Sequence, residues 1–365
     1  MPLTFTQSDK LFRESRINEL ARVPEGSRFL KLRSLSRREY LERLFDEVRG
    51  ERPAVGPRQL FQAAFDDQGI SMHEVEEVIR RIHGEARAVR AANEPGLLNQ
   101  LYRVQEFSWG GLYQNRLEQT IVDNYVKRIQ DYDALCRSVD NELLVSMRAY
   151  VVSSWYNHWT SIIIEDIFKD HPSVLPAVGL VKQIDFFIHD VPFDLKVTYL
   201  PEGFLIDKRR QAGLRPETTL LRGVARRNGI PLDSGLAASA LLQDLWNKVG
   251  DHPAEESRQL ITELRGFRND LVGSIENDPE ELVRWLYENQ GERRFDSSNR
   301  LFLVLVDQRN YFDSWKLKRA RPLMEAKVRE HLSNYGQQPG RHVEFQWKGE
   351  QYTAISDVII VKQPQ

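Results

Sequence analysis

The residue types best suited to chemistry lie in one short segment, QIDFFIHDVPFDLKVT, at positions 183–198. Asp185 stands in its first half, and Asp194 and Lys196 stand two residues apart in its second half. Their neighbours are almost all apolar. Charged groups on otherwise apolar strands cost free energy unless they are paired or bind a metal ion, so this cost indicates a functional role.

Two carboxylates on adjacent strands can lie about 5 Å apart and share one divalent cation through their oxygens. Mg²⁺ suits such a site, because it binds one or two carboxylates and keeps waters and substrate phosphate oxygens as its other ligands. Lys196 could orient an attacking water, help to deprotonate it and offset the charge that builds on the phosphate. The pattern predicts Mg²⁺-dependent hydrolysis of phosphodiester bonds, with Mn²⁺ able to substitute.

The segment resembles the PD-(D/E)XK nuclease superfamily, the fold of most type II restriction endonucleases and of several repair and defence nucleases. The resemblance covers residues 154–198 well and the C-terminal part loosely. It implies that Asp185 and Asp194 are metal-binding acids and that Lys196 is the motif lysine. It also implies that the backbone carbonyl of Leu195 is a metal ligand.

In that family a glutamate-bearing helix precedes the hairpin. Here Trp155–Phe168 is the candidate helix, and its Glu165 matches the helix glutamate and completes the predicted catalytic set. Asp166, next to it, is interpreted as a solvated helix residue, although the two roles could be exchanged. The segment departs from the family pattern at Ile184, which replaces the proline, and at Asp194, where glutamate is commoner, but neither departure removes a ligand type.

Two β-rich runs, Lys182–His189 and Pro192–Tyr199, are joined by a short connection and predict a hairpin. Later in the chain Arg300–Val306 (RLFLVLV) is nearly all apolar, which is typical of a central strand covered on both faces. A further helix and a closing strand pair are expected at Phe312–His331, Val343–Trp347 and Ala354–Val361.

The region from Gln7 to about Tyr150 has helical apolar spacing almost throughout and no strand-like alternation. We therefore expect a helical N-terminal domain, residues 1–145, and a mixed α/β (α+β) nuclease domain, residues 146–365. The resemblance implies a restriction-endonuclease-like mixed central sheet flanked by helices. The length of 365 residues supports two domains, because single cores usually stop growing near ~250–300 residues.

The composition is that of an ordinary globular protein, with 41% hydrophobic and 28% charged residues. The sequence has no membrane-length apolar run and no signal-like N-terminus. Its single cysteine, Cys136, allows neither an internal disulfide nor a thiolate zinc site, so we expect a cytoplasmic protein. The net charge of −2 means that nucleic-acid binding would need a local basic surface.

A basic run, DKRRQAGLRPETTLLRGVARR, follows the hairpin at Asp207–Arg227. Beside a nuclease cleft these bases would neutralise DNA phosphates, and some could read guanine edges. The alternative is a solvated helix face, although only Asp207 and Glu217 offset the seven bases. The predicted DNA-binding residues are Lys208, Arg209, Arg210, Arg215, Arg222, Arg226 and Arg227.

Other patterns carry weaker or competing interpretations. Gln59–Ile82 has a helix-turn-helix rhythm, but its second helix carries several glutamates that would repel DNA, so we interpret it as helix packing. Asp185 and Lys196 could form only a cross-strand ion pair. The GxxxxGK[ST], GxSxG and HExxH patterns are absent, which removes common ATPase, hydrolase and metalloprotease alternatives.

The expected function is a Mg²⁺-dependent endonuclease acting on double-stranded DNA, with sequence-specific restriction as the leading role. A cut through both strands needs two active sites, so we expect a homodimer. A cognate methyltransferase or another defence-system component would be encoded alongside. The alternatives are a defence effector, repair nuclease or junction resolvase with another substrate, or an inactive nucleic-acid-binding or scaffold protein on the same fold.

Overall fold

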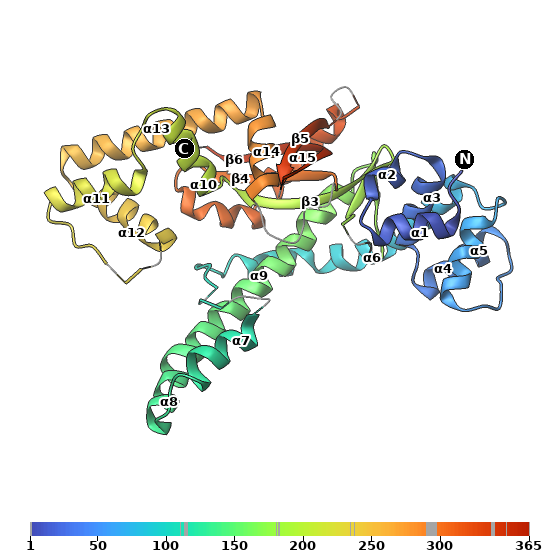
Figure 1. The fold of residues 1–365 in the computed structure, drawn as a ribbon, viewed down its shortest axis with the longest axis horizontal. Helices are drawn as coiled ribbons and strands as arrows, with labels where there is room; N and C mark the ends of the chain where they lie inside the picture. Colours follow the sequence, from blue (N-terminus) through green and yellow to red (C-terminus); the bar gives the residue numbers. More distant parts are fainter. Residues whose placement is uncertain are drawn as a thin grey trace.

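A computed structural model describes residues 2–109, 111–112, 116–179, 181, 183–233, 235–236, 238–289, 298–336, 340–347 and 349–364. This part of the chain is a mixed α/β structure built on one six-stranded sheet. In Figure 1 the sheet lies at the centre, helical lobes lie at both ends of the molecule, and a helical arm projects from the middle. The expectation of a mixed α/β fold is confirmed at this level.

The sheet has the strand order β1-β2-β3-β4-β6-β5. The first three strands form an antiparallel meander, β3, β4 and β6 run parallel, and β5 closes one edge in antiparallel fashion. The strands are β1 (Val174–Pro176), β2 (Phe186–Ile188), β3 (Val191–Tyr199), β4 (Arg300–Asp307), β5 (Arg341–Trp347) and β6 (Glu350–Gln363).

The central strand is β4, and both of its faces are buried as its apolar sequence predicts. Leu301 and Leu303 pack on the side of α9 (Leu144–Lys169) and α15 (Arg321–Asn334). Phe302, on the opposite face, packs with side chains of the helices that connect β3 to β4. Helices therefore cover the sheet on both faces.

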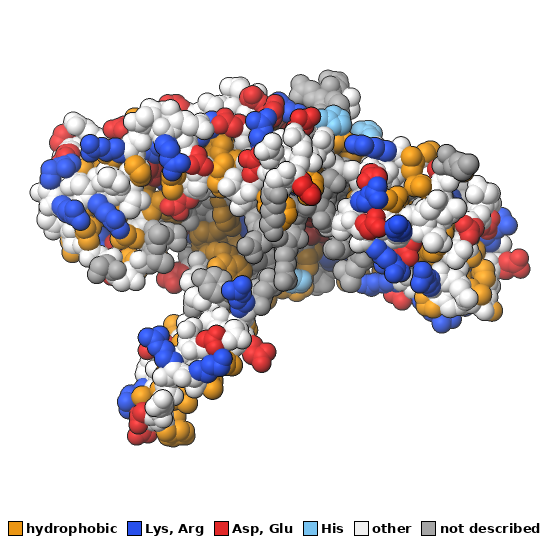
Figure 2. Space-filling model, in the orientation of Figure 1, with side chains coloured by type: hydrophobic (Ala, Val, Ile, Leu, Met, Phe, Trp, Pro, Cys, Tyr) orange, Lys and Arg blue, Asp and Glu red, His pale blue; other side chains and the backbone are white. Residues whose placement is uncertain are grey.

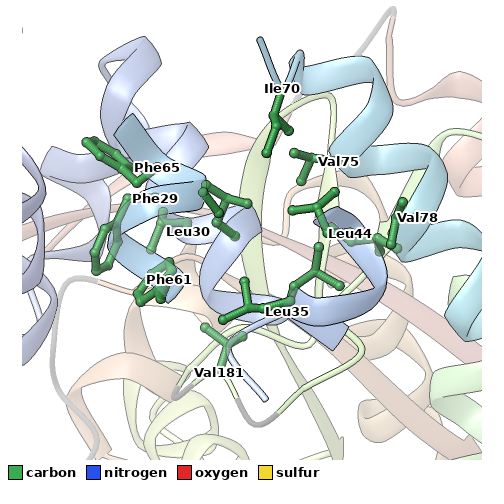
Figure 3. Packing of buried hydrophobic residues seen from close by; sticks show 14 of the residues in the cluster. Phe29, Leu30, Leu35, Leu44, Phe61, Phe65, Ile70, Val75, Val78 and Val181 are labelled. Atoms are coloured by element: carbon green, nitrogen blue, oxygen red, sulfur yellow. The ribbon is translucent and has the colours of Figure 1, made fainter. Parts of the chain in front are cut away.

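The N-terminal lobe is entirely helical, and no strand precedes Val174 in the described part of the chain. Its aromatic core, which includes Phe29 and Phe61, extends to Val181 (Figure 3) and also includes Phe187 of β2. The lobe thus packs directly against the hairpin of β2 and β3. Its helices are α1 (Phe5–Arg13), α2 (Ile17–Ala21), α3 (Pro24–Ser34), α4 (Arg38–Val48), α5 (Pro57–Asp66) and α6 (Met72–Leu101).

A helical insertion connects β3 to β4, and part of it forms the opposite lobe with its own apolar core around Leu245 and Leu264. The helices of the insertion are α10 (Glu202–Gln211), α11 (Glu217–Arg227), α12 (Ala238–Asp251), α13 (Glu255–Asn277) and α14 (Glu280–Asn289). In Figure 1 α11 and α12 lie at the far end of the molecule from the N-terminal lobe.

The projecting arm consists of α7 (Leu117–Ile121), the π-helical turns η2 (Val122–Val126) and η3 (Val139–Leu143), α8 (Tyr132–Ser138) and the first half of α9. Its helices run on continuously from α8 through η3 into α9, which crosses the position expected for the domain boundary. None of the described side chains from position 116 to position 152 is buried.

Several sequence expectations for the C-terminal half need refinement. Strand β1 was not anticipated, and β2 is shorter than the expected run. The expected helix from Phe312 is two elements, the 3₁₀ helix η4 (Tyr311–Arg319) and α15, which separate at Ala320. Pro322 stands in the first turn of α15, where a missing N–H group costs nothing. Among the described residues no helix is long and apolar enough to span a bilayer.

Candidate active site

The hairpin of β2 and β3 is a short antiparallel pair in which Phe186 faces Phe193 and Ile188 faces Val191. Its two turn residues, His189 and Asp190, both have positive φ angles, 47° and 69°, as a two-residue hairpin turn requires. Neither is glycine, so the turn carries some strain.

This turn is held from outside by the N-terminal lobe. The amine of Lys31, a buried residue of α3, contacts the carboxylate of Asp190 and lies 2.6 Å from Oε1 of Glu76 on α6. Glu76 and Asp190 thus share one buried ammonium group. The N-terminal helices therefore fix the position of the hairpin by charge as well as by apolar packing.

Asp185 lies immediately before β2, one register step beyond the pair of Phe186 with Phe193, and so stands opposite Asp194. The N–H group of Leu195 donates a 2.7 Å hydrogen bond to its Oδ2, and its own N–H group donates to the carbonyl of Phe193 at 2.8 Å. The Asp185 carboxylate thus accepts a backbone hydrogen bond from β3 that a backbone carbonyl would accept if β2 were longer.

Asp194 lies on β3 between two cationic side chains. Nζ of Lys196 donates a 2.5 Å hydrogen bond to its Oδ1, which agrees with the expectation that the two share a face. Nε of Arg300, on the neighbouring residue of β4, lies 3.5 Å from its Oδ2. The guanidinium of Arg300 also lies over the ring of Tyr287, 5.0 Å from the ring centre.

Glu165 approaches Asp185 from helix α9. Burial raises the pKa of Asp185 to about 6, and the negative charges of Glu165 and Asp194 act in the same direction. The hydrogen bond from Leu195 and the charge of Lys169 oppose this rise. Glu165 and Asp194, the other two acids that the sequence singles out, therefore both act electrostatically on Asp185.

Asp166 is buried, contrary to the interpretation of it as a solvated residue. Its carboxylate accepts hydrogen bonds of 2.8 and 2.6 Å from Arg90 on α6. Burial would raise its pKa, but hydrogen bonds from His83 and Arg90 lower the pKa to about 2. Asp166 ties α9 to α6, whereas Glu165 at the neighbouring position pairs with Lys169 and acts on Asp185 through its charge.

The donor atoms at this site fit a hard divalent cation, because carboxylate and carbonyl oxygens are what Mg²⁺ prefers. The C=O group of Leu195 points to the same side of β3 as its N–H group, toward Asp185. Within the described ranges, however, no three or more His, Cys, Asp or Glu side chains are grouped as a ready metal site. Lys196 now contacts Asp194, and Lys169 contacts Glu165 at 2.8 Å, so a cation would compete with both amines.

The basic run does not form one surface. Arg209 is fully buried on α10, donates from Nε to the carbonyl of Arg215 at 2.9 Å and lies over the ring of Phe267. The expected DNA contact of Arg209 is therefore wrong for this structure, because its guanidinium has no access to solvent. The apolar face of α10 includes the position of this residue.

The other bases of the run differ in their partners. Lys208 contacts Glu281, Arg210 lies 3.2 Å from Asp207, and Arg227 lies 2.5 Å from Glu256. Exposed bases for which the described residues supply no ion pair are Arg215, Arg222 and Arg226. These helices follow the C-terminal end of β3, whereas Asp194 lies near its N-terminal end (Figure 1).

Sequence reasoning missed two basic residues of the site. Lys169 is four positions after Glu165 on the same helix, a spacing that places oppositely charged side chains together. Arg300 begins an otherwise apolar central strand, and that unusual position was the available signal. Comparisons of the chain with protein-family models, with curated proteins and with solved structures gave no match.

Proposed function

We propose that the protein is a Mg²⁺-dependent endonuclease that hydrolyses phosphodiester bonds in double-stranded DNA, in the manner of a type II restriction endonuclease. The proposed active site comprises Asp185, Asp194, Lys196 and Glu165. The observation that carries the proposal is the position of the buried Asp185 opposite Asp194, whose Oδ1 accepts a 2.5 Å hydrogen bond from Lys196; burial and the charges of Glu165 and Asp194 raise the pKa of Asp185 there. Negatively charged carboxylates that lie close together in a buried site repel one another, and a bound divalent cation would offset that repulsion.

The arrangement of the chain supports the same proposal. A helix that carries Glu165 precedes the hairpin, the hairpin supplies the other acids and the lysine, and the mixed sheet has helices on both faces. These are the features that the resemblance to the PD-(D/E)XK superfamily implies. The sequence-specific restriction role and the cytoplasmic location rest on that resemblance and on composition.

Each residue would have a distinct task. A bound Mg²⁺ would supply Lewis-acid polarisation of the scissile phosphate and lower the pKa of a water. Asp185, Asp194 and the Leu195 carbonyl would hold the cation, and Glu165 would orient water at its edge. Lys196 would then leave Asp194 and face the phosphate, where its charge offsets the charge that develops in the transition state.

The test is incubation of the purified protein with supercoiled plasmid in Mg²⁺ or in EDTA, followed by gel electrophoresis. We expect nicked or linear product in Mg²⁺ only, and discrete fragments if cleavage is sequence-specific. Asp185→Asn and Lys196→Ala should each lower the rate by about a hundredfold or more. Glu330→Gln, an exposed acid on α15, is the matched control and should cleave normally.

Two results would contradict the proposal. Wild-type protein that leaves duplex DNA intact in Mg²⁺ and in Mn²⁺ would refute the activity. Cleavage by Asp185→Asn at the wild-type rate would refute the site. Parallel reactions with single-stranded DNA and RNA distinguish the restriction role from that of a nuclease with another substrate.

A further inference from the structure

The helical arm exposes apolar side chains without a core of its own. From position 116 to position 152 no described residue is buried, although the sequence there is rich in leucine, valine and tyrosine. Short helices are marginally stable in water unless an apolar face is packed against something. The described part of one chain leaves the apolar side chains of the arm exposed or half-buried.

One stripe of exposed side chains runs along the continuous helix of α8, η3 and α9, with other exposed residues such as Val145 beside it. The spacings between its members are those of residues on one helix face. Leu144 and Val151 are 55% and 56% exposed, and Trp155 is 36% exposed. The stripe consists of Tyr132, Asp140, Leu144, Arg148, Val151 and Trp155.

The charges of the arm argue against a polyanionic partner. The sequence from Arg116 to Val152 contains five basic and six acidic residues. Nucleic acids and anionic membranes select an excess of lysine and arginine, which this balance does not provide. In Figure 2 basic, acidic and hydrophobic side chains are intermingled on the visible side of the arm. Another helix with paired charges fits this surface better.

We propose that the stripe is a self-association surface that binds the same stripe of a second copy in antiparallel orientation. With a twofold axis at Leu144, residues equally distant from Leu144 face each other. Asp140 of each copy then meets Arg148 of the other, and Leu144 meets its own copy. Tyr132, twelve residues before Leu144, comes within one position of the point that faces Trp155 of the second copy, eleven residues after Leu144. The charges match twice, and the two Leu144 side chains lie between the charged pairs.

The size of this contact suits a specific dimer. Tyr132–Trp155 spans about 35 Å at 1.5 Å per residue. Pairing over that length, with the neighbouring helix η2 at the margin, buries on the order of 800 Å² per partner, the amount typical of stable complexes. The pairing does not depend on the proposed activity, although a twofold dimer would supply the two active sites that a double-strand cut needs.

The first test is the molar mass of the full chain by light scattering or sedimentation over a range of concentrations. Wild-type protein should be dimeric, and Arg148→Asp or Asp140→Arg should each weaken the dimer by roughly tenfold or more, because like charges then face each other. The double variant Asp140→Arg with Arg148→Asp should restore the dimer. Circular dichroism checks that each variant keeps its helices.

The second test is disulfide capture at the twofold axis. Leu144→Cys in a Cys136→Ser background should form a covalent dimer on oxidation, because a residue on the axis meets its own copy. The matched control is Val89→Cys, which is 67% exposed but lies on α6, outside the arm. Monomeric wild-type protein at every concentration overturns the proposal, and so does a dimer that neither charge reversal weakens.

Discussion

The backbone N–H group of Leu195 donates a 2.7 Å hydrogen bond to Oδ2 of Asp185, and this bond links the two strands of the candidate site through the main chain. A donor of this kind favours the ionised carboxylate. Burial and the charges of Glu165 and Asp194 favour the protonated form more strongly, so the pKa of Asp185 is raised to about 6. Asp185 therefore changes its charge close to neutral pH.

Because of this titration, we expect the ionised form of Asp185 to lower the free energy of unfolding of the metal-free protein. Folding raises the pKa of Asp185, so its protonated form stabilises the fold below about pH 4, and that contribution is lost as the pH rises through about 6. In metal-free buffer near pH 8, Asp185→Asn should raise the free energy of unfolding by about 1–2 kcal/mol. Denaturant unfolding at several pH values measures this gain, which should vanish near pH 4.

Added Mg²⁺ provides the complementary measurement. It should stabilise the wild-type protein against unfolding and have a much smaller effect on Asp185→Asn, because only the wild type keeps the full set of acids. Glu39→Gln, an exposed acid of α4, serves as the control and should show the wild-type response. Equal stability of Asp185→Asn and wild type near pH 8 would contradict the assigned burial of this charge.

Two neighbouring acids of α9 should separate catalysis from stability. Asp166 is buried and its pKa is lowered to about 2, so its stabilising contribution is present above about pH 4 and is lost as the pH falls through 2. Asp166→Asn should cost about 3 kcal/mol at neutral pH, since it leaves Arg90 without its anionic partner. Glu165→Gln should leave the free energy of unfolding almost unchanged and reduce cleavage strongly. If Glu165→Gln destabilised the fold and Asp166→Asn reduced cleavage without destabilising it, the roles of the two acids would be exchanged.

We expect the basic residues after the hairpin to differ in function, with some binding DNA and Arg209 stabilising the fold. Arg222 and Arg226 are exposed, so replacing both with alanine should flatten the slope of log affinity against log salt by roughly 1–2 if both contact phosphate. Arg209→Ala should instead destabilise the fold by about 2–4 kcal/mol, because Arg209 fills the interior over Phe267. DNA-binding titrations at several salt concentrations give the slope. An unchanged slope in the double variant would place DNA contact on another surface.

The N-terminal lobe should support the site through Lys31. Removing this buried amine in Lys31→Ala leaves Asp190 and Glu76 without their shared partner, and should lower the free energy of unfolding by about 2 kcal/mol. Lys31→Met keeps most of the volume and should cost less. Since Asp190 lies in the hairpin turn, both variants should also slow cleavage. Unaltered cleavage in both would show that the turn holds its position without Lys31.

Much of the site's framework could be predicted from the sequence, because it depends on local patterns. Alternation along QIDFFIHDVPFDLKVT correctly indicated the hairpin and the shared face of Asp194 and Lys196. The apolar run from Arg300 correctly indicated a central strand, and the last two strands pair as expected. These features follow from side-chain period and turn geometry, which a single sequence displays.

The rest depended on contacts between distant parts of the chain. Asp166 and Glu165 are adjacent acids with the same local surroundings, and only the packing of α6 against α9 shows that Asp166 is buried. Arg209 resembles its charged neighbours in sequence, yet its side chain lies on the buried side of α10. Strand β1 has three residues and carries no alternation of its own. Local pattern contains no information on which face of a helix another element will cover.

Strands β3 and β4 are neighbours in the sheet, yet Asp194 and its partner Arg300 are separated in sequence by the whole helical insertion. Such a pairing gives the sheet a high contact order, and loop-closure entropy must be lost before the parallel hydrogen bonds form. The insertion has its own apolar core, so early folding of its helices would shorten the effective loop. We therefore expect assembly of the candidate site, which needs β3, β4 and Arg300 together, to be a late step in refolding that depends on the insertion more than on the hairpin.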